Sequence, residues 1–262
     1  MKARKRFGQH FLQDTRILQQ MLIAIQPKQN DHLVEIGPGH GALTEYLIGK
    51  SSHFNLIEID RDLIMILQEK FKEHATIFEG DVLNFDFKQL EGDALRIVGN
   101  LPYNISTPLL FHLFDSIDLI KDMHFLLQKE VVDRLTAKIG TNDYNRLSVM
   151  TQYYCDNDML FTVGPEAFDP PPKVQSAFVR LQPKKRHTIA KDIKSFNRIV
   201  REAFTYRRKT LSNCLKKLIT ADQLKALDID PSLRPQQLSV EDYIRISNLM
   251  DKSKIATTNK KA

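Results

Sequence analysis

The chain contains 262 residues, of which 42% are hydrophobic and 27% charged, with a formal net charge of +6. These proportions are ordinary for a globular protein, and no apolar run approaches the ~20 residues that a membrane-spanning helix needs. Cys155 and Cys214 stand far apart and outside any CxxC pattern, so we expect reduced thiols and no metal site. The basic N-terminus leads into no apolar signal region, which predicts a cytoplasmic protein.

The charge is distributed unevenly along the chain. Residues 1–180 contain 19 Lys and Arg against 24 Asp and Glu, whereas residues 181–262 contain 19 against 8. A strongly basic segment is typical of nucleic-acid binding, and a solvated helical face is the alternative interpretation. We therefore predict an α/β domain over residues 1–183 with a basic N-terminal arm, a basic helical domain suited to RNA over residues 184–252, and a disordered tail over residues 253–262.

The first predicted elements are typical of a nucleotide-binding α/β unit. Asp14 is a predicted N-cap for a helix that ends before Pro27. A strand at residues 33–36 then leads into the glycine turn Gly37-Pro-Gly-His-Gly-Ala42 and a short helical pattern. Glycines allow the backbone to approach a ligand, and a helix N-terminus supplies free N–H groups. Strand, glycine turn and helix in this order predict a cofactor site, although the glycine pattern alone is weak evidence.

The next strand, predicted at residues 54–59, contains an acidic residue at an informative spacing. Glu58 lies 21 residues after Gly37. An acidic residue at about this distance accepts hydrogen bonds from ribose hydroxyls in dinucleotide-binding folds. The pattern Gly37-x-Gly-x-x-Ala42 also fits the dinucleotide fingerprint, so NAD and other adenosyl cofactors are both open at this point.

Two further strand ends carry polar residues. Asp81 is placed either to take the exocyclic amine of an adenine or to cap its own loop. Asn100-Leu-Pro-Tyr103 follows a buried strand and precedes a helix, so a stiff proline corner carries an amide and an aromatic ring. Because the carboxyl ends of parallel strands meet at one edge of a sheet, we expect these residues to share a site with Gly37 and Glu58.

The second half of the chain predicts a mixture of elements. Strands are expected at 123–128, 159–163 and 177–181, and helices at 131–138, 147–155, 195–204, 211–218, 224–227 and 240–250. Phe168 precedes three consecutive prolines and is either an exposed stacking surface or a core residue. Tyr206-Arg-Arg-Lys-Thr210 forms a cationic corner suited to phosphates.

Five of these motifs together resemble the ribosomal RNA adenine N6-dimethyltransferase family. They are Phe7-Gly-Gln-His-Phe-Leu12, Glu35-Ile-Gly-Pro-Gly39, Glu58-Ile-Asp60, Asn100-Leu-Pro-Tyr-Asn-Ile105 and Phe168-x-Pro-Pro-Pro-Lys-Val174. The resemblance covers residues 4 to about 250, and the combination is far more specific than any one motif. Arg207-Arg-Lys-Thr-Leu211 and the Asn100 motif resemble the housekeeping branch more than the Erm branch that methylates large-subunit RNA.

The resemblance implies a fold and a reaction. The fold is a Rossmann-like, seven-stranded α/β sheet of the S-adenosylmethionine-dependent methyltransferases, with a small all-helical C-terminal domain. The implied reaction dimethylates N6 of two adjacent adenosines in the hairpin loop near the 3′ end of 16S rRNA. The implied partner is that RNA within an assembling 30S subunit, the enzyme is expected to be a monomer, and the role is in small-subunit biogenesis.

The resemblance also assigns roles by position. Gly37 would approach the methionine part of S-adenosylmethionine, Glu58 its ribose and Asp81 its adenine. His10 and Leu12 match an N-terminal segment that closes on the cofactor, although the family usually has Asn where this sequence has His10.

The resemblance places Asn100 at the reaction site, where it would contact both cofactor and substrate. Our hypothesis is that its side-chain oxygen and the Leu101 carbonyl accept hydrogen bonds from the adenine amine, so that no general base is required. Tyr103 and Phe168 are the candidates for stacking on a base that has left its helix.

Three alternatives belong to other classes. An NAD-linked oxidoreductase fits the glycine turn and Glu58 but leaves the Asn100 motif unexplained. An Erm-type large-subunit methyltransferase shares the chemistry, and a non-enzymatic RNA-binding assembly factor fits the charge.

Overall fold

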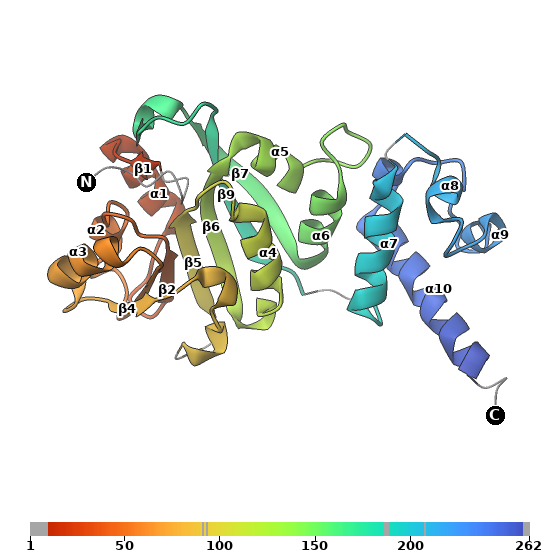
Figure 1. Ribbon diagram of the computed structural model, residues 1–262, viewed down its shortest axis with the longest axis horizontal. Helices are drawn as coiled ribbons and strands as arrows, with labels where there is room; N and C mark the ends of the chain where they lie inside the picture. Colours follow the sequence, from red (N-terminus) through yellow and green to blue (C-terminus); the bar gives the residue numbers. More distant parts are fainter. Residues whose placement is uncertain (1–9, 91, 93, 186–188, 207, 259–262) are drawn as a thin grey trace. The chain divides into compact units, whose positions relative to one another are not determined.

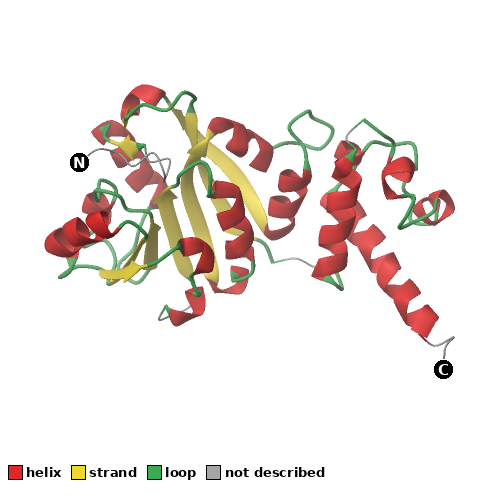
Figure 2. Ribbon diagram, viewed as in Figure 1, coloured by secondary structure: helices red, strands yellow, loops and turns green. Residues whose placement is uncertain are grey.

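The chain forms two compact units. The computed structural model describes residues 10–90, 92, 94–185, 189–206 and 208–258. One unit comprises Met1–Val132 with Cys155–Pro183, and the other comprises Asp133–Tyr154 with Lys184–Ala262. Within the described residues, all strands belong to the first unit and the second contains helices and loops (Figures 1 and 2). The division predicted at residue 183 differs from these units over residues 133–154.

A seven-stranded sheet is the centre of the first unit and confirms the predicted α/β class. Its order is β4-β3-β2-β5-β6-β9-β7. The strands are β2 His32–Ile36, β3 His53–Glu58, β4 Thr76–Glu79, β5 Leu95–Asn100, β6 Ile120–Gln128, β7 Cys155–Val163 and β9 Ser176–Pro183. The first five run parallel, whereas β9 is antiparallel to both β6 and β7.

The strand order reverses at β2, which determines where a ligand can bind. In the registers of its two neighbours, Val34 of β2 lies opposite Asn55 of β3 and Ile97 of β5. From β2 the chain proceeds outward through β3 to β4, and then returns to the other side of β2 for β5 and β6. In open α/β sheets, the crevice outside the carboxyl ends at such a switch point is the usual ligand site.

Helices of the first unit complete its core. They are α1 Thr15–Ile25, α2 Thr44–Leu47, α3 Arg61–Phe71 and α4 Ser106–Phe114, while α5 Lys129–Leu135 runs from this unit into the next. Short 3-10 helices are η2 Val82–Asn84, η3 Phe87–Gln89, η4 Ile117–Leu119 and η5 Pro165–Ala167. As predicted, the Asp14 side chain caps α1 by accepting from the Arg16 main-chain N–H. Apolar residues of α1, α2 and α3, including Met21, Leu47 and Leu67, pack with those of the sheet in one cluster.

A second, two-stranded sheet fixes the start of the described chain. In it β1, Phe11–Leu12, pairs antiparallel with β8, Phe168–Asp169. Phe11 lies opposite Asp169 and Leu12 opposite Phe168, and the next residue, Gln13, donates its main-chain N–H to the Ala167 carbonyl over 2.8 Å. The N-terminal segment is therefore held on the loop that precedes β9.

The second unit is helical in its described residues. Its helices are α6 Arg146–Tyr154, α7 Ile193–Thr205, α8 Leu211–Leu215, α9 Ala221–Lys225, η6 Pro235–Gln237 and α10 Val240–Thr258. Helix α7 buries Phe196, Ile199, Val200 and Ala203 and packs against α6 and α10. The partnership of α6 with α7 is why residues 133–154 belong to this unit. Helix α10 continues to Thr258, past residue 252 where the sequence predicted a tail, because Lys, Ile and Ala are compatible with helical backbone geometry.

No helix among the described residues combines the length and the apolarity that crossing a bilayer demands.

Candidate functional site

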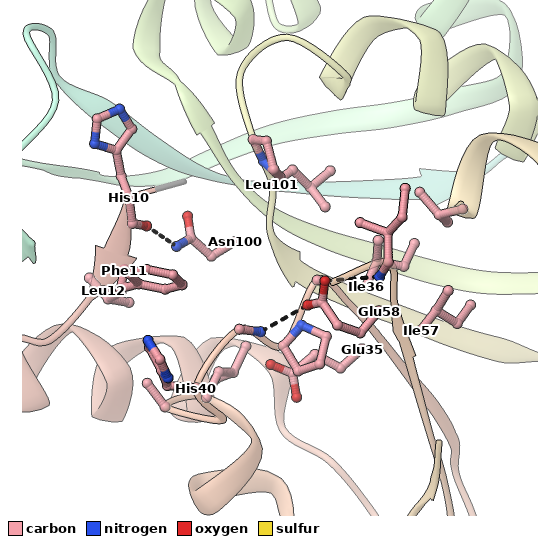
Figure 3. A pocket seen from close by; sticks show the side chains of 18 of the residues that line it. His10, Phe11, Leu12, Glu35, Ile36, His40, Ile57, Glu58, Asn100 and Leu101 are labelled. Atoms are coloured by element: carbon pink, nitrogen blue, oxygen red, sulfur yellow. Dashed lines mark hydrogen bonds between the residues drawn. The ribbon is translucent and has the colours of Figure 1, made fainter. Parts of the chain in front are cut away.

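A cavity of about 470 Å³ lies at the carboxyl ends of β2, β3, β4 and β5. This volume is within the range of ~300–1,000 Å³ that small-molecule sites occupy. All nine residues that the sequence analysis singled out line this cavity: His10, Leu12, Gly37, Glu58, Asp81, Asn100, Leu101, Tyr103 and Phe168. Figure 3 shows several of them converging from the N-terminal segment and from successive strand ends.

The glycine turn after β2 is shaped by positive backbone dihedrals. Gly39 has φ +61°, and a Cβ at this position would lie 3.2 Å from the Phe11 ring. Gly41 has φ +85°, and a Cβ there would overlap the Phe71 ring of α3. Both positions therefore require glycine, one for the approach of β1 and the other for helix packing.

Glu58 is a buried carboxylate that the backbone holds in place. Its Oε1 accepts from the main-chain N–H groups of Ile59 and Asp60, each over 2.9 Å, and its Oε2 accepts from Gly39 over 3.3 Å. Burial raises the pKa of Glu58, and these three N–H donors oppose that shift. The side chain thus joins the end of β3 to the glycine turn while lining the cavity.

Glu35, the penultimate residue of β2, is a second acid at the cavity. Its Oε2 accepts from Thr44 Oγ1 over 2.7 Å, and the residue is only 2% exposed. Burial raises the pKa of Glu35 to about 8, and the nearby charge of Glu58 adds to the shift while the Thr44 hydrogen bond opposes it. The Glu35 carboxyl is therefore protonated near neutral pH, unlike an ordinary glutamate.

Asp81 caps its own loop, which was one of its two predicted roles. Its Oδ1 accepts from the Leu83 main-chain N–H over 3.0 Å, and its Oδ2 accepts from Asn84 Nδ2 over 3.2 Å. These bonds make it the N-cap of η2. Asp81 lines the cavity as well, so the cap fixes where its carboxylate stands.

Asn100, the last residue of β5, is tied to the N-terminal segment. Its Nδ2 donates to the main-chain carbonyl of His10 over 3.0 Å (Figure 3). His10 Nδ1 in turn lies 2.7 Å from the Pro170 carbonyl oxygen. A contact between residues 90 positions apart thus links the corner after β5 to the segment before β1.

The two aromatic candidates differ in their setting. Tyr103 is part-buried, and its hydroxyl forms a 2.8 Å hydrogen bond with Ser176 Oγ at the start of β9. Burial raises the pKa of Tyr103, so the phenol is neutral. Phe168 is only 5% exposed and belongs to the core cluster, so the interpretation of an exposed stacking surface is wrong and the core alternative holds. Its ring still forms part of the cavity wall.

Several lining residues were not singled out from the sequence. Phe11 packs on His40 with ring centroids 4.5 Å apart, and Ile59 and Val82 supply apolar wall. Glu35 had a recognisable signal, because it is an acid within an otherwise apolar strand. Phe11 had only its place in the N-terminal motif, because its partners lie far away in the sequence.

The charges around the cavity determine which ligands suit it. None of the described lining residues is Lys or Arg, whereas four have a carboxyl group: Glu45, Glu58, Asp81 and Glu35, the last of which burial keeps protonated near neutral pH. The N–H of Gly39, which a dinucleotide-binding turn would offer to pyrophosphate, faces the Glu58 carboxylate instead. These features suit an adenosyl ligand with a cationic centre better than a dinucleotide. No cluster of His, Cys, Asp and Glu with metal-binding geometry occurs in the part of the chain that the structure describes.

Comparisons with known proteins agree with this geometry. Residues 1–252 match the family described as ribosomal RNA adenine dimethylase. The "ribosomal RNA small subunit methyltransferase A" of Coxiella burnetii (strain CbuG_Q212) is 56% identical over 255 residues, covering 96% of this chain and 99% of its own. The protein of the same name from Pseudomonas aeruginosa is 51% identical over 253 residues, covering 94% of each chain.

Two solved structures are also similar to this chain. A dimethyladenosine transferase from Plasmodium falciparum superposes with a TM-score of 0.80 at 26% identity, covering 93% of this chain and 98% of its own. The 23S rRNA methyltransferase ErmE superposes with a TM-score of 0.72 at 23% identity, covering 92% of this chain and 99% of its own, which shows a shared fold. The chain belongs to the ribosomal RNA adenine dimethylase family.

Proposed function

We propose that this protein transfers methyl groups from S-adenosylmethionine to N6 of two adjacent adenosines in the hairpin loop near the 3′ end of 16S rRNA, within assembling 30S subunits. One observation carries the proposal: the corner Asn100-Leu-Pro-Tyr103 lies on the wall of a cavity that is lined by acidic side chains and, among the described residues, by no Lys or Arg. High identity to proteins named for the small subunit favours this substrate over large-subunit RNA.

The residues present fit this cofactor. Glu58 and Asp81 are placed to accept from ribose hydroxyls and an adenine amine, and Ile59 and Val82 supply apolar wall for the base. Gly37, with φ +63°, would let the backbone of the turn approach the remaining part of the ligand, and Leu12 lines the same cavity. When bound, S-adenosylmethionine would supply a methyl group on a sulfonium that requires no further activation.

Asn100 and Leu101 form the acceptor side of the site. Because Asn100 Nδ2 is engaged by His10, its Oδ1 is the atom available to an incoming amine. Together with the Leu101 carbonyl, it would accept both amine hydrogens and hold the nitrogen lone pair towards the methyl group. With the cofactor bound, this arrangement would leave the amine free to take up a methyl group, and the surplus proton of the product nitrogen would pass to solvent. Alignment of this kind accounts for up to ~7–11 kcal/mol in well-positioned reactions.

The target base has to leave its stack, and aromatic residues offset that cost. Extrusion of a base costs a few kcal/mol, and less from a loop than from a duplex. Stacking on an aromatic side chain contributes ~1–3 kcal/mol per base. Tyr103, held by its hydrogen bond to Ser176, lines the cavity and is our candidate for stacking on the extruded base.

The second unit is our candidate for holding the RNA backbone. Lys194, Arg198 and Arg201 are exposed on one side of α7, opposite its buried apolar face. Tyr206 is 54% exposed, with Lys209 Nζ 4.4 Å from its ring centroid. Arg207 of the same motif and the basic arm at residues 1–9 lie outside the described residues. Binding through such cations releases counterions, so we expect association with small subunits to weaken steeply with salt.

We also infer that the protein works as a monomer in the cytoplasm, where small subunits assemble. The decisive experiment incubates the purified protein with labelled S-adenosylmethionine and unmethylated small subunits, with large-subunit RNA in a parallel reaction. We expect N6-dimethyladenosine in the small-subunit RNA alone. Labelling of large-subunit RNA would favour the Erm alternative, and calorimetric binding of NAD without any methyl transfer would favour the oxidoreductase.

A further inference from the structure

His10 makes two hydrogen bonds that lead in opposite directions. Its ring Nδ1 lies 2.7 Å from the Pro170 carbonyl oxygen, just beyond β8. Its own carbonyl oxygen accepts from Asn100 Nδ2 over 3.0 Å. The imidazole also lies beside Tyr103, with ring centroids 5.7 Å apart. One residue thus contacts the loop before β9, the amide at the end of β5 and an aromatic wall of the cavity.

The chemistry of the acceptors fixes the sense of both bonds. A carbonyl oxygen can only accept, so Pro170 requires a proton on His10 Nδ1. By the same reasoning, the His10 carbonyl requires the NH₂ of Asn100. An Asn100 amide rotated by half a turn would bring two oxygens together, leaving both without a donor. The His10 carbonyl therefore selects the amide orientation in which Oδ1 is available to a substrate amine.

We propose that His10 is a positioning residue for the methyl-acceptor side of the site, because its ring anchor on Pro170 holds the carbonyl that orients the Asn100 amide. The inference rests on the proposed function of Asn100, and it gives the N-terminal segment a role in the chemical step in addition to cofactor binding. The β1–β8 ladder holds the following residues and supports the same placement.

The anchor also predicts which side chains can replace His10. The donor that the structure uses is Nδ1, which is bonded to Cγ, as the Nδ2 of an asparagine is. Asparagine can therefore present a donor to Pro170 at nearly the same distance from the main chain. A role that depended on the outer nitrogen, Nε2, would not survive this exchange. His10→Asn and His10→Ala therefore separate the two possibilities.

The kinetic test compares the wild type with His10→Asn, His10→Ala, Asn100→Ala and the double variant His10→Ala/Asn100→Ala. His74→Ala, an exposed histidine after α3, is the matched control. We expect His10→Ala to lower kcat roughly tenfold, since small misplacements of reacting groups are costly, while the cofactor Kd stays within about twofold. His10→Asn should restore kcat, and the double variant should be no slower than Asn100→Ala alone.

Other outcomes would overturn the proposal. It fails if His10→Ala weakens cofactor binding with kcat unchanged, if His10→Asn is as slow as His10→Ala, or if the two substitutions act additively. A second readout does not depend on turnover. The Asn100 side-chain NH₂ resonances of ¹⁵N-labelled protein, assigned by their loss in Asn100→Ala, should shift in His10→Ala and stay in place in His10→Asn. Unshifted resonances would refute the positioning role, whereas absence of methyl transfer by the wild type would refute the proposed function instead.

Discussion

The carboxylate of Glu58 accepts a hydrogen bond from the main-chain N–H of Gly39 over 3.3 Å. This contact joins the end of β3 to the glycine turn after β2, and two further N–H groups hold the other carboxylate oxygen. An acid fixed by three main-chain donors needs no rearrangement to receive a ligand. It is therefore an acceptor whose geometry is determined before the cofactor arrives.

Replacement of Glu58 should act on cofactor affinity. In Glu58→Gln the charge is lost and one oxygen becomes a donor, which cannot accept from a ribose hydroxyl or from Gly39. Hydrogen bonds to charged groups contribute ~1.5–3 kcal/mol, so we expect the Kd for S-adenosylmethionine to rise roughly 10- to 100-fold in titration calorimetry. Glu79→Gln, at the half-exposed end of β4, is the control and should bind normally. Equal affinities in the two variants would contradict the ribose role.

Replacement of Asn100 should act on the chemical step. Asn100→Ala removes the acceptor that aligns the amine, together with the donor to His10. We expect kcat to fall by at least ~100-fold, because alignment supplies most of the acceleration. Cofactor affinity and the unfolding transition should stay close to wild type. Normal turnover of unmethylated small subunits by this variant would remove Asn100 from the mechanism.

The two roles open to Tyr103 can be separated by two substitutions. Tyr103→Phe keeps the ring and removes only the hydrogen bond to Ser176, so we expect turnover within about threefold of wild type. Tyr103→Ala removes the ring, and the loss of ~1–3 kcal/mol of stacking should lower kcat/KM for the RNA by roughly 10- to 100-fold. If Tyr103 only shapes the pocket through Ser176, the two variants should be impaired alike.

The part of this site that could be predicted from the sequence is the part encoded by local order. A strand followed by a polar residue, repeated along a parallel sheet, places Gly37, Glu58, Asp81 and Asn100 together because their strands end at the same edge. The pairing of Phe11 with Asp169 was not predictable, since no periodicity relates segments so far apart. The contact of Asn100 with His10 depends on that pairing, and so does the burial of Phe168.

The domain boundary illustrates the same limit. The helix predicted at residues 147–155 is present as α6, Arg146–Tyr154, with Cys155 already in β7, but a helical pattern does not say which unit receives its apolar face. That choice depends on α7 and α10, which come later in the chain.

The raised pKa of Glu35 predicts a pH dependence of stability. Its pKa is about 8 in the folded protein and close to the ordinary 4.5 when unfolded. Below pH 4.5 both states are protonated, so ionisation contributes nothing. Between pH 4.5 and 8 the unfolded state loses its proton first, so the free energy of unfolding falls as pH rises. Glu35→Gln keeps the acceptor for Thr44 but cannot ionise, and should escape this loss.

The measurement is denaturant unfolding of both proteins at pH 5 and pH 9. The advantage of Glu35→Gln over wild type should grow by a few kcal/mol between the two, at ~1.4 kcal/mol per unit of pKa difference. Glu45→Gln, which is exposed on α2, is the control and should show no such growth. An advantage of Glu35→Gln that is the same at both pH values would mean that Glu35 is already ionised in the folded protein.

Arg96, at the opposite end of β5 from Asn100, should be a determinant of stability. Its guanidinium donates to Asp122, to Asp31 over 2.7 Å and to the carbonyls of Ile25 and Gln26 at the end of α1. Arg96 is 6% exposed and Asp31 4%. Breaking a buried ion pair by removing one partner costs ~3–5 kcal/mol, so Arg96→Met should lower the free energy of unfolding by about that amount.

An exposed pair supplies the matched control for this prediction. Arg180→Met removes a salt bridge to Asp158 in which both side chains are more than 40% exposed, and should lower the free energy of unfolding by at most ~1 kcal/mol.

The ion pairs around Arg96 should also determine the pH at which the protein unfolds in acid. Burial opposes ionisation of Asp31, but hydrogen bonds from Lys121 and Arg96 lower its pKa to about 2, against 3.8 ordinarily. This stabilisation is complete above pH 3.8 and is lost as pH falls towards 2. Because Arg96→Met removes one of the two cations, its acid unfolding should begin at a higher pH than that of wild type, and coincident acid transitions would show that Lys121 alone holds Asp31 ionised.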